Sequence, residues 1–538
     1  MALRWAAAGF VETGKNYRRI MGYQQLWMLK AALDEPLEDE ALQPTKDADS
    51  LTRMQTALAL GTQRSGSRNR ADQPRNRQAA LIVAFAFSPS FPRDFEPMNF
   101  LSREATVAKP GFSRWLVPPA AISVHMCIGE VYGFSVFNVP LTQAGAGWTI
   151  PQVGWVYSIA LVMLGMSAAV FGKWVERSGP RKTMVASCFC FCGGLLVSAI
   201  GVKLKSLWLI YFGYGVIGGV GLGLGYISPV SMLIKWFPDR PGMATGMAIM
   251  GFGGGALIGA PLGVKLMDYF KSDTSVGVAE TFVVMAVLYA ISMLFGASLV
   301  RVPPEGWKPE GWEPSQHVKP MMTNAHVGVY VAWKTPQFWC LWVVLCMNVS
   351  AGIGILGQAS KMCSDMFGVS EAVGGGFAGM LSIFNMVGRF VWSSVSDYTG
   401  RKTVYSIYFL LGALLYCVVP WTQGIQSKTL YVVVTAIIVT MYGGGFATIP
   451  AYLRDMFGSY QIGAIHGRLI TAWSVAAILG PSLVNYISTA KIEAGVPKAE
   501  AYNSTMFLMA GLLIIGLIAN LLVRPVDPKC HVTEFAKV

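Results

Sequence analysis

Charged residues are scarce in this chain. Asp, Glu, Lys and Arg together make up 13% of its 538 residues, whereas about a quarter of a soluble domain is charged. Hydrophobic residues, by contrast, account for 53%. This balance excludes an ordinary soluble protein. It predicts a polytopic membrane protein, because long apolar segments need a bilayer rather than water around them.

Acidic residues are the scarcer of the two charged classes. The chain has 29 acidic and 42 basic residues, which gives a net charge of +13. In a soluble chain this excess would suggest a nucleic-acid partner. Here the basic residues lie in loops between apolar segments. The positive-inside bias of membrane proteins therefore explains them better, and we expect no nucleic-acid partner.

The sequence also lacks the usual patterns of catalysis and metal binding. Its nine cysteines show no metal-ligand spacing, and Cys188, Cys190 and Cys192 alternate within an apolar segment, as small buried side chains would. No phosphate-binding Walker pattern occurs, so nothing suggests that ATP drives the protein. No pairing of a nucleophile with a base stands out. We therefore expect no enzymatic activity, no metal and no cofactor.

Residues 1–97 differ from the rest of the chain. They are rich in Arg, Gln, Asn and Ser around Arg64–Gln78. Their longest apolar run, Ala79–Phe87, is too short to cross a bilayer. We expect this region to be disordered or not translated, with Met98 as the alternative start, because Met98 begins a short polar lead into the first apolar segment.

From Trp115 onward, one apolar stretch after another is long enough to cross a bilayer. The prediction is an all-α membrane protein with twelve transmembrane helices in two pseudo-symmetric six-helix halves, 98–301 and 336–523. A polar cytoplasmic linker, 302–335, separates the halves, and 524–538 forms a cytoplasmic tail. The predicted spans are 115–139, 151–172, 183–202, 207–231, 243–267, 279–300, 336–359, 372–395, 403–421, 429–450, 463–487 and 504–523.

Loop charge predicts the orientation of the bundle. The turn Lys173–Lys182 carries four basic residues, and the turns around Lys235–Arg240 and Arg401–Lys402 are also basic. The opposite loop, 140–150, has no Lys or Arg. Because Lys and Arg gather on the cytoplasmic side, both termini are expected in the cytoplasm. The cysteine usage and the lack of a transit peptide fit a bacterial inner (plasma) membrane.

One motif occurs in both halves, in the turns after the second and eighth spans. Each turn places an acid, a glycine and an Arg-Lys pair at like spacing. A carboxylate near a helix end can hold the basic pair, and glycine permits a tight turn. Ordinary basic turns would explain the charge but not the repeated spacing. The sequence therefore predicts two conformational-gate loops, made of Gly172, Glu176, Arg177, Gly179, Arg181 and Lys182, and of Asp397, Gly400, Arg401 and Lys402.

These paired turns resemble the signature loop of the major facilitator superfamily, and the arrangement of two six-span halves agrees with it over residues 115–523. Further stretches resemble the oxalate:formate antiporter family and the related monocarboxylate transporters. They are Cys127–Phe137 (CIGEVYGFSVF), Lys235–Arg240 (KWFPDR), and Tyr442–Phe446 (YGGGF) leading to Asp455–Gly458 (DMFG). The resemblance implies secondary transport of a small organic anion.

Arg389 is the main candidate for binding that anion. It lies eight residues before Asp397, which on a helix is about 12 Å and close to the bilayer middle. An arginine in lipid costs at least a few kcal/mol and usually has something to bind. Asn385 lies one turn away on the same face, and an amide beside a guanidinium fits a carboxylate. The alternative is a structural ion pair, but no partner acid is evident at this depth in the second half.

The resemblance implies the same role, because both families place a substrate-binding arginine in the eighth span. The oxalate carrier has a second cation, a lysine, in its eleventh span, and Trp473 takes that place here. Two fixed cations suit a dicarboxylate and one suits a monocarboxylate. We therefore expect a substrate of the lactate, pyruvate or formate type. The resemblance also places Tyr132 and Tyr442 around it. For these three aromatic residues, packing within the bundle is the alternative.

The first span holds two ionisable residues, His125 and Glu130. A carboxylate in the membrane is costly unless it is protonated or paired, so Glu130 is a candidate proton carrier and a candidate ion-pair partner of Arg389. His125 is the second proton-coupling candidate, since imidazole titrates near neutral pH. Hydrogen bonding within the bundle is the alternative for both. We expect His466 and Arg468, at the start of the eleventh span, to contact headgroups or loops.

The sequence thus predicts a monomeric secondary transporter that carries a small monocarboxylate by alternating access with proton symport. The glycines of Gly251–Gly263 in the fifth span and Gly480-Pro481 in the eleventh would provide the tight, deformable contacts that rocking halves need. Two alternatives stay open. One is an anion exchanger of the oxalate:formate type, with a counter-anion in place of the proton. The other, of a different class, is a substrate-sensing membrane receptor without net transport.

Overall fold

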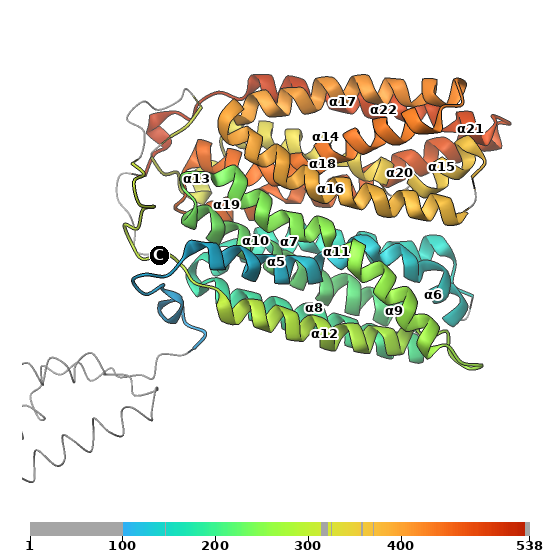
Figure 1. Ribbon diagram of the computed structural model, residues 1–538, viewed down its shortest axis with the longest axis horizontal. Helices are drawn as coiled ribbons and strands as arrows, with labels where there is room; N and C mark the ends of the chain where they lie inside the picture. Colours follow the sequence, from blue (N-terminus) through green and yellow to red (C-terminus); the bar gives the residue numbers. More distant parts are fainter. Residues whose placement is uncertain are drawn as a thin grey trace, which may run out of the picture. The chain divides into compact units, whose positions relative to one another are not determined.

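The structure is a computed structural model that describes residues 100–145, 147–313, 321–323, 325–356, 359–369 and 371–532. Long helices account for most of these residues, and Figure 1 shows them lying side by side. The predictions for residues 1–97 and for Met98 lie outside the described residues.

Six long helical segments form the N-terminal half. The first, Arg114–Ala144, consists of η2 (Arg114–Leu116), α5 (Val117–Ile128), η3 (Gly129–Phe137) and α6 (Asn138–Ala144). The fourth, Leu207–Trp236, consists of α9 (Leu207–Ile210), η4 (Tyr211–Gly218) and α10 (Gly219–Trp236). The others are α7 (Ile150–Ser178), α8 (Pro180–Lys203), α11 (Pro241–Phe270) and α12 (Val278–Leu299).

Six more form the C-terminal half. They are α14 (Pro336–Leu356), α16 (Glu371–Thr399), α17 (Arg401–Gly424), α18 (Lys428–Phe457), the segment Ile462–Glu493, and α22 (Asn503–Leu522). Ile462–Glu493 consists of α19 (Ile462–Leu469) and α20 (Thr471–Glu493). The short helices η1 (Glu104–Thr106), α13 (Val329–Ala332), α15 (Ala359–Phe367), α21 (Lys498–Ala501) and η5 (Pro528–Cys530) lie outside the long segments.

These helices confirm the predicted fold class of twelve spans in two six-helix halves. Among the described residues, eleven segments are long and apolar enough to cross a membrane. The twelfth is α16, of 29 residues, which packs between α11 and α18. Most of the observed helices begin earlier or end later than the predicted spans. The last turns of a membrane helix contain polar as well as apolar residues, so hydropathy does not mark where the helix ends.

The two halves form two layers (Figure 1). The N-terminal half runs from blue to green and the C-terminal half from yellow to red. Between them, α11 packs against α16 and α18, and α7 packs against α19 and α20. These helices therefore line the interface where a site shared by the two halves would lie.

Glycine lets the helices approach at backbone distance. A Cβ added to Gly255 of α11 would lie 2.6 Å from the Cα of Gly129 in η3. A Cβ on Gly172 of α7 would lie 2.9 Å from the Cα of Ala464 in α19, across the two halves. Small residues at these points give the close packing on which helix association in lipid depends.

The turns between α7 and α8 and between α16 and α17 are built alike. Gly179 has φ +81° and Gly400 has φ +89°, and a helix begins at the next residue in each case. Such positive φ favours glycine, which explains why glycine recurs at this point of the motif. We call the end of the bundle that carries these two turns and Lys235–Arg240 the basic end.

Candidate functional site

Arg389 lies on α16 at the interface of the two halves and is fully buried. Its Nε donates to Oδ1 of Asn385 at 3.0 Å, and its Nη1 lies 3.5 Å from the carbonyl oxygen of Ile249 on α11. Glycines on both neighbouring helices make room for the side chain. A Cβ on Gly253 of α11 would lie 2.7 Å from Nε, and one on Gly443 of α18 would lie 3.1 Å from Cγ.

One nitrogen of the Arg389 guanidinium is unpaired in the part of the chain that the structure describes. Its Nη2 has no hydrogen-bond partner among the described residues. The ion pairs found in the same part of the chain do not include Arg389. A buried cation without a counter-charge is costly, so a site of this kind favours the entry of an anion.

Aromatic rings surround the guanidinium. The Cζ of Arg389 lies 5.3 Å from the ring centroid of Phe446 and 5.9 Å from those of Tyr132 and Phe252. Trp473 closes the group, with its ring 4.5 Å from Phe446 and 5.3 Å from Phe252. These distances suit cation–π and aromatic contacts. We call these four rings, together with Tyr226 at 5.5 Å from Trp473, the aromatic cage.

All five predicted substrate-binding residues gather at this place. Tyr132 of η3 and Tyr442 of α18 join the two halves through their hydroxyl oxygens, 3.0 Å apart. Trp473 of α20 is fully buried, and Asn385 binds the arginine directly. Phe252, Phe446 and Tyr226 were not predicted. An aromatic residue in an apolar segment resembles ordinary bundle packing, so the sequence carried no sign of them.

Replacing Gly443 with alanine is expected to reduce transport about tenfold through a steric effect of the order of 1–3 kcal/mol. The new Cβ would lie 2.6 Å from Oδ1 of Asn385 and would also meet its backbone, forcing α18 away from α16. Uptake assays and thermal melting would measure the effect. Gly193→Ala on α8 is the control, because its Cβ would meet nothing within 4 Å. Equal uptake by both variants would contradict this account of the site.

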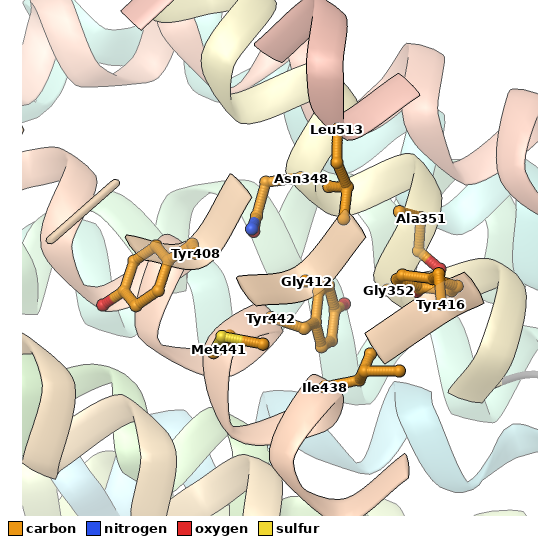
Figure 2. Close-up of a pocket in the computed structure, with 10 residues that line it drawn as sticks. All are labelled: Asn348, Ala351, Gly352, Tyr408, Gly412, Tyr416, Ile438, Met441, Tyr442 and Leu513. Carbon is orange, nitrogen blue, oxygen red and sulfur yellow. The ribbon is translucent and has the colours of Figure 1, made fainter. Parts of the chain in front are cut away.

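A small cavity lies beside Tyr442 in the C-terminal half (Figure 2). Arg389 is not among the residues that line it. The lining residues come from α14, α17, α18 and α22 and are Asn348, Ala351, Gly352, Tyr408, Gly412, Tyr416, Ile438, Met441, Tyr442 and Leu513.

Glu130 lies inside the N-terminal half rather than beside Arg389. Its Oε2 accepts a hydrogen bond from the hydroxyl of Tyr214 at 3.0 Å, and its Oε1 has no partner within the described part of the chain. A Cβ on Gly259 of α11 would lie 2.7 Å from the Cγ of Glu130 and 3.1 Å from the hydroxyl of Tyr289. The expected ion pair between Glu130 and Arg389 is therefore not formed in this structure.

His125 is fully buried between α10 and α11. Its Nδ1 lies 2.5 Å from the carbonyl oxygen of Ala248, and its Nε2 lies 3.2 Å from that of Tyr226. Both neighbours are acceptors, and a neutral imidazole can donate to only one of them. In the neutral ring, one nitrogen therefore donates to a carbonyl oxygen and the other faces a carbonyl oxygen without a proton between them.

The expectation for His466 was wrong. Its side chain is 1% exposed, and its ring lies 5.8 Å from that of Tyr226. α19 packs against α7, which covers the residue and removes it from any headgroup. Arg468 is partly exposed and stacks on Tyr330 of α13 at 5.5 Å, which agrees with the expected loop contact.

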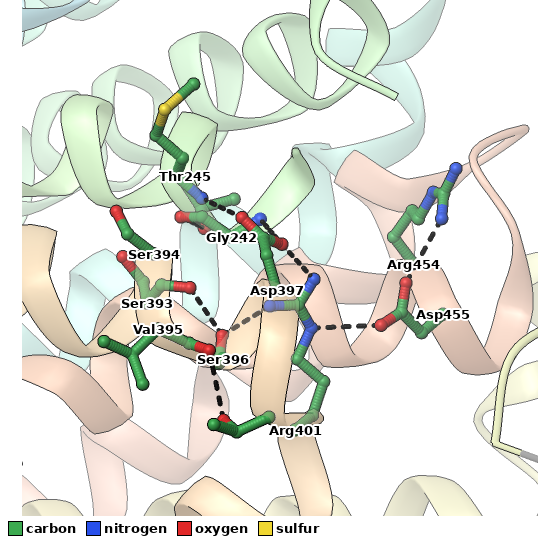
Figure 3. Close-up of polar contacts among 12 residues, drawn as sticks. Gly242, Thr245, Ser393, Ser394, Val395, Ser396, Asp397, Arg401, Arg454 and Asp455 are labelled. Carbon is green, nitrogen blue, oxygen red and sulfur yellow. Dashed lines mark hydrogen bonds and ion pairs between the residues drawn. The ribbon is translucent and has the colours of Figure 1, made fainter. Parts of the chain in front are cut away.

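The acids of the two repeated turns bind the opposite half. Oδ1 and Oδ2 of Asp397 accept hydrogen bonds from the backbone N–H groups of Gly242 and Met243 at the start of α11, both at 2.8 Å (Figure 3). Oε1 of Glu176 accepts from the N–H of Gly463 at the start of α19, also at 2.8 Å. Carboxylates at helix N-termini are favourable, because the free N–H groups and the helix dipole attract them.

The basic pairs depart from the prediction. Arg401 fits it, since it binds Asp397 at 2.6 Å and Asp455 at 3.0 Å, and Arg454 joins at 3.2 Å (Figure 3). Arg181 differs from the prediction, because it donates hydrogen bonds to the backbone carbonyl oxygens of Phe100, Ala297 and Val300.

The remaining basic residues of the two turns are not held by the carboxylate of their own turn either. Lys402 binds the carbonyl oxygens of Leu521 and Val523 at the end of α22. Glu176 pairs instead with Lys235 at 2.6 Å. Arg177 and Lys182 are exposed. A carboxylate therefore holds the arginine in the second repeat only.

Two six-helix halves that enclose a buried cation at their interface, and that hold each other at one end, define a membrane transporter. The chain belongs to the Major Facilitator Superfamily, whose family model matches residues 120–481 and, in a second match, 367–535. This finding confirms the family that the paired turns predicted.

Curated relatives of the chain include transporters of small anions. The uncharacterized MFS-type transporter YhjX of Escherichia coli (strain K12) is 26% identical over 68% of this chain and 86% of its own. The oxalate:formate antiporter of Oxalobacter formigenes is 24% identical over 70% and 85%. Apicoplast pyruvate carrier 1 of Toxoplasma gondii is 26% identical over 61% and 68%.

Solved structures agree on the fold. The proton:xylose symporter XylE has a TM-score of 0.57 at 12% identity, covering 76% of this chain and 96% of the symporter. The transporter FucP in its outward conformation has a TM-score of 0.55 at 12% identity, covering 76% and 99%.

Proposed function

We propose that the chain is a secondary active transporter of a small monocarboxylate of the lactate, pyruvate or formate type, working by alternating access with proton symport. The observation that carries this proposal is Arg389, a fully buried guanidinium among aromatic rings, whose Nη2 has no partner among the described residues. A carboxylate would satisfy the free donor and neutralise the charge, and the rings would cover the apolar part of the acid.

Charge balance favours one carboxylate over two. The groups that surround the guanidinium are rings and an amide, and the position of a second cation is taken by the neutral Trp473. A second buried carboxylate would have no cation to offset its desolvation. The names of the relatives, which mention oxalate, formate and pyruvate, support the wider class of small organic acids.

Alternating access has physical support at the basic end. Asp397 and Glu176 hold the first turns of α11 and α19, which belong to the opposite half in each case. A rocking motion that opens this end must break both contacts and form them again. On this proposal the basic end faces the cytoplasm, together with both termini, and the transporter works as a monomer in a plasma membrane.

Glu130 is the first candidate for the proton site. It is buried, one of its oxygens has no partner in the described region, and it lies against Gly259 of α11. The same helix meets Arg389 at Gly253, about 9 Å along its axis. A shift of α11 would therefore act on the proton site and on the substrate site together. His125, which bridges α10 and α11, is the second candidate.

Glu130→Gln is expected to abolish proton-driven uptake while leaving counterflow of labelled substrate intact. The amide keeps the shape and the contact with Tyr214 but cannot release a proton. Uptake with and without an inward proton gradient, followed by counterflow in the same proteoliposomes, would measure both. His125→Gln is the matched comparison. A variant that still concentrates substrate on a proton gradient would move the proton site away from Glu130.

The test of the proposal as a whole is uptake of labelled lactate, pyruvate, formate and oxalate into proteoliposomes, with and without an inward proton gradient. Uptake of one monocarboxylate driven by the gradient would support it. Oxalate uptake that occurs only against internal formate would instead favour an exchanger, the second candidate, to which the similarity with the oxalate:formate antiporter points. Binding of one of these acids without its uptake would favour a substrate-sensing membrane receptor.

A further inference from the structure

Two cations from opposite halves lie beside one aromatic ring at the basic end. Nζ of Lys173 on α7 lies 4.2 Å from the ring centroid of Tyr330, and Cζ of Arg468 on α19 lies 5.5 Å from the same centroid. Tyr330 belongs to α13, which packs against α19 (Figure 1). These distances suit cation–π contacts, so one ring gathers a positive charge from each half.

Neither cation has an acidic partner among the described residues. The ion pairs found there include neither Lys173 nor Arg468. Arg468 donates to the carbonyl oxygen of Ala464 on its own helix at 3.4 Å. The acid of α7, Glu176, binds Lys235 at 2.6 Å instead. Closing the basic end therefore brings two like charges together, which repel each other unless an anion binds between them.

The level of the two cations matches the headgroup region of a bilayer. Lys173 lies nine residues after Leu164, the midpoint of α7, and Arg468 lies nine residues before Ala477, near the midpoint of Ile462–Glu493. On helices, both therefore lie about 14 Å from the middle of their segments. Half of the hydrocarbon thickness is about 15 Å, so both side chains can reach the phosphate groups of the lipids.

Exposed apolar side chains lead from the hydrocarbon region to Lys173. Met166 and Val170 on α7 are 48% and 68% exposed, and they precede Lys173 by seven and three residues. Residues at this spacing share one face of a helix. The rings of Tyr330 and Trp333 are also exposed at this end, as is typical of the boundary between lipid and water. The surface of α7 therefore offers an acyl chain an apolar path that ends at a cation.

We propose that Lys173 and Arg468 bind the phosphodiester headgroup of an anionic phospholipid, and that Tyr330 keeps the two cations together. The phosphate oxygens accept from both cations, and the apolar path on α7 selects a lipid over a water-soluble phosphate. The bound lipid joins the two halves and favours the form in which the basic end is closed. The site does not include Arg389, so it is independent of the proposed cargo.

The test titrates the purified full chain in detergent with dioleoylphosphatidylglycerol and with dioleoylphosphatidylcholine. Thermal melting measures the stabilisation, and native mass spectrometry counts the bound lipids. Wild type should bind the anionic lipid more tightly, because each basic residue near its headgroup contributes a factor of about five in affinity. Lys173→Gln and Arg468→Gln should each weaken binding of the anionic lipid by about this factor, and the double variant should bind both lipids alike.

Matched controls change the same residue types elsewhere. Lys109→Gln and Arg524→Gln remove exposed cations and should keep the wild-type preference for the anionic lipid. Tyr330→Phe keeps the ring and should keep the preference too, whereas Tyr330→Ala should weaken it. Glycerol 3-phosphate is the third probe. It carries a phosphate without acyl chains and should not stabilise the protein.

Spin labels at Lys182→Cys and Tyr398→Cys, both exposed near the basic end, would show whether the lipid acts on the distance between the halves. The exposed Cys417 would be replaced by serine. In nanodiscs, the anionic lipid should raise the population with the shorter distance relative to phosphatidylcholine. Lys173→Gln should remove this difference. This readout needs neither a known substrate nor transport.

Four outcomes would overturn the lipid site. Wild type could bind the two lipids equally, or the double variant could keep the preference. The controls could lose it as well, which would indicate a general attraction to charge. Glycerol 3-phosphate could stabilise the protein as much as the lipid does, which would make a soluble anion the ligand. Identical distances in the two lipids would overturn the role in closing. Loss of uptake with an intact lipid preference would count against the proposed function alone.

Discussion

Replacing Arg389 with glutamine is expected to abolish uptake of every carboxylate, with a fall in kcat/KM of about 100-fold or more. Two hydrogen bonds to a charged group contribute about 3 kcal/mol together, which corresponds to this factor. The melting temperature should stay the same or rise, because the substitution removes a buried charge whose Nη2 has no partner among the described residues. Uptake in proteoliposomes and thermal melting in detergent measure the two effects.

The combination of these two readouts separates a ligand site from a structural one. If Arg389 served a structural ion pair, its removal would destabilise the bundle by about 3–5 kcal/mol. Arg389→Lys is the matched variant, since it keeps the charge but loses the planar fork of donors, and should retain only about a tenth of the uptake. Normal uptake by the glutamine variant would remove Arg389 from the centre of the mechanism.

The second large effect is expected at Asp397. Asp397→Asn takes the charge from the carboxylate that binds α11 and Arg401, and breaking a buried ion pair costs about 3–5 kcal/mol. Part of this cost should appear as a population in which the basic end is open. Transport should slow about tenfold or more, because the closed form that the cycle must pass through is less populated.

Spin labels at Arg177→Cys and Tyr398→Cys, both exposed near the basic end, would report the opening as a longer distance between the halves. The exposed Cys417 would be replaced by serine in this background. Asp273→Asn, in an exposed loop after α11, is the control and should leave distance and rate unchanged. An unaltered distance distribution in Asp397→Asn would show that this contact does not hold the halves together.

The lengths and spacing of the apolar stretches predicted the twelve spans, because each helix must cover about 30 Å of hydrocarbon. Arg389 was also visible, since a lone cation at that depth is rare enough to stand out. Tyr132, Tyr442 and Trp473 entered through the family resemblance. The apolar members of the cage, Phe252 and Phe446, could not be recognised, because nothing distinguishes a ring that faces a ligand from one that faces a neighbouring helix.

The direction in which the side chain of Glu130 leaves its helix was not predictable, for a different reason. Glu130 lies in η3, where the helix is of the 3-10 type, so the residue spacing of a regular α-helix does not give its direction. The partners of Asp397 and Glu176 were hidden as well. Their partners in the opposite half are backbone N–H groups, which every residue except proline carries, so no residue type marks them in the sequence.

One helix meets four of the groups to which a role has been assigned. Along α11, Gly242 binds Asp397, Ala248 binds His125, Gly253 lies against Arg389, and Gly259 lies against Glu130. These positions recur every five or six residues, about 8–9 Å apart.

α11 therefore has little freedom to drift during evolution on the faces that meet these groups, since a substitution at each of the four positions disturbs a different part of the cycle. α12 follows it in the chain and is its opposite, because many of its large apolar side chains are exposed. Divergence within the family should accumulate on α12 and on similar outer helices. New substrate preferences should arise from residues that face α11 rather than from α11 itself.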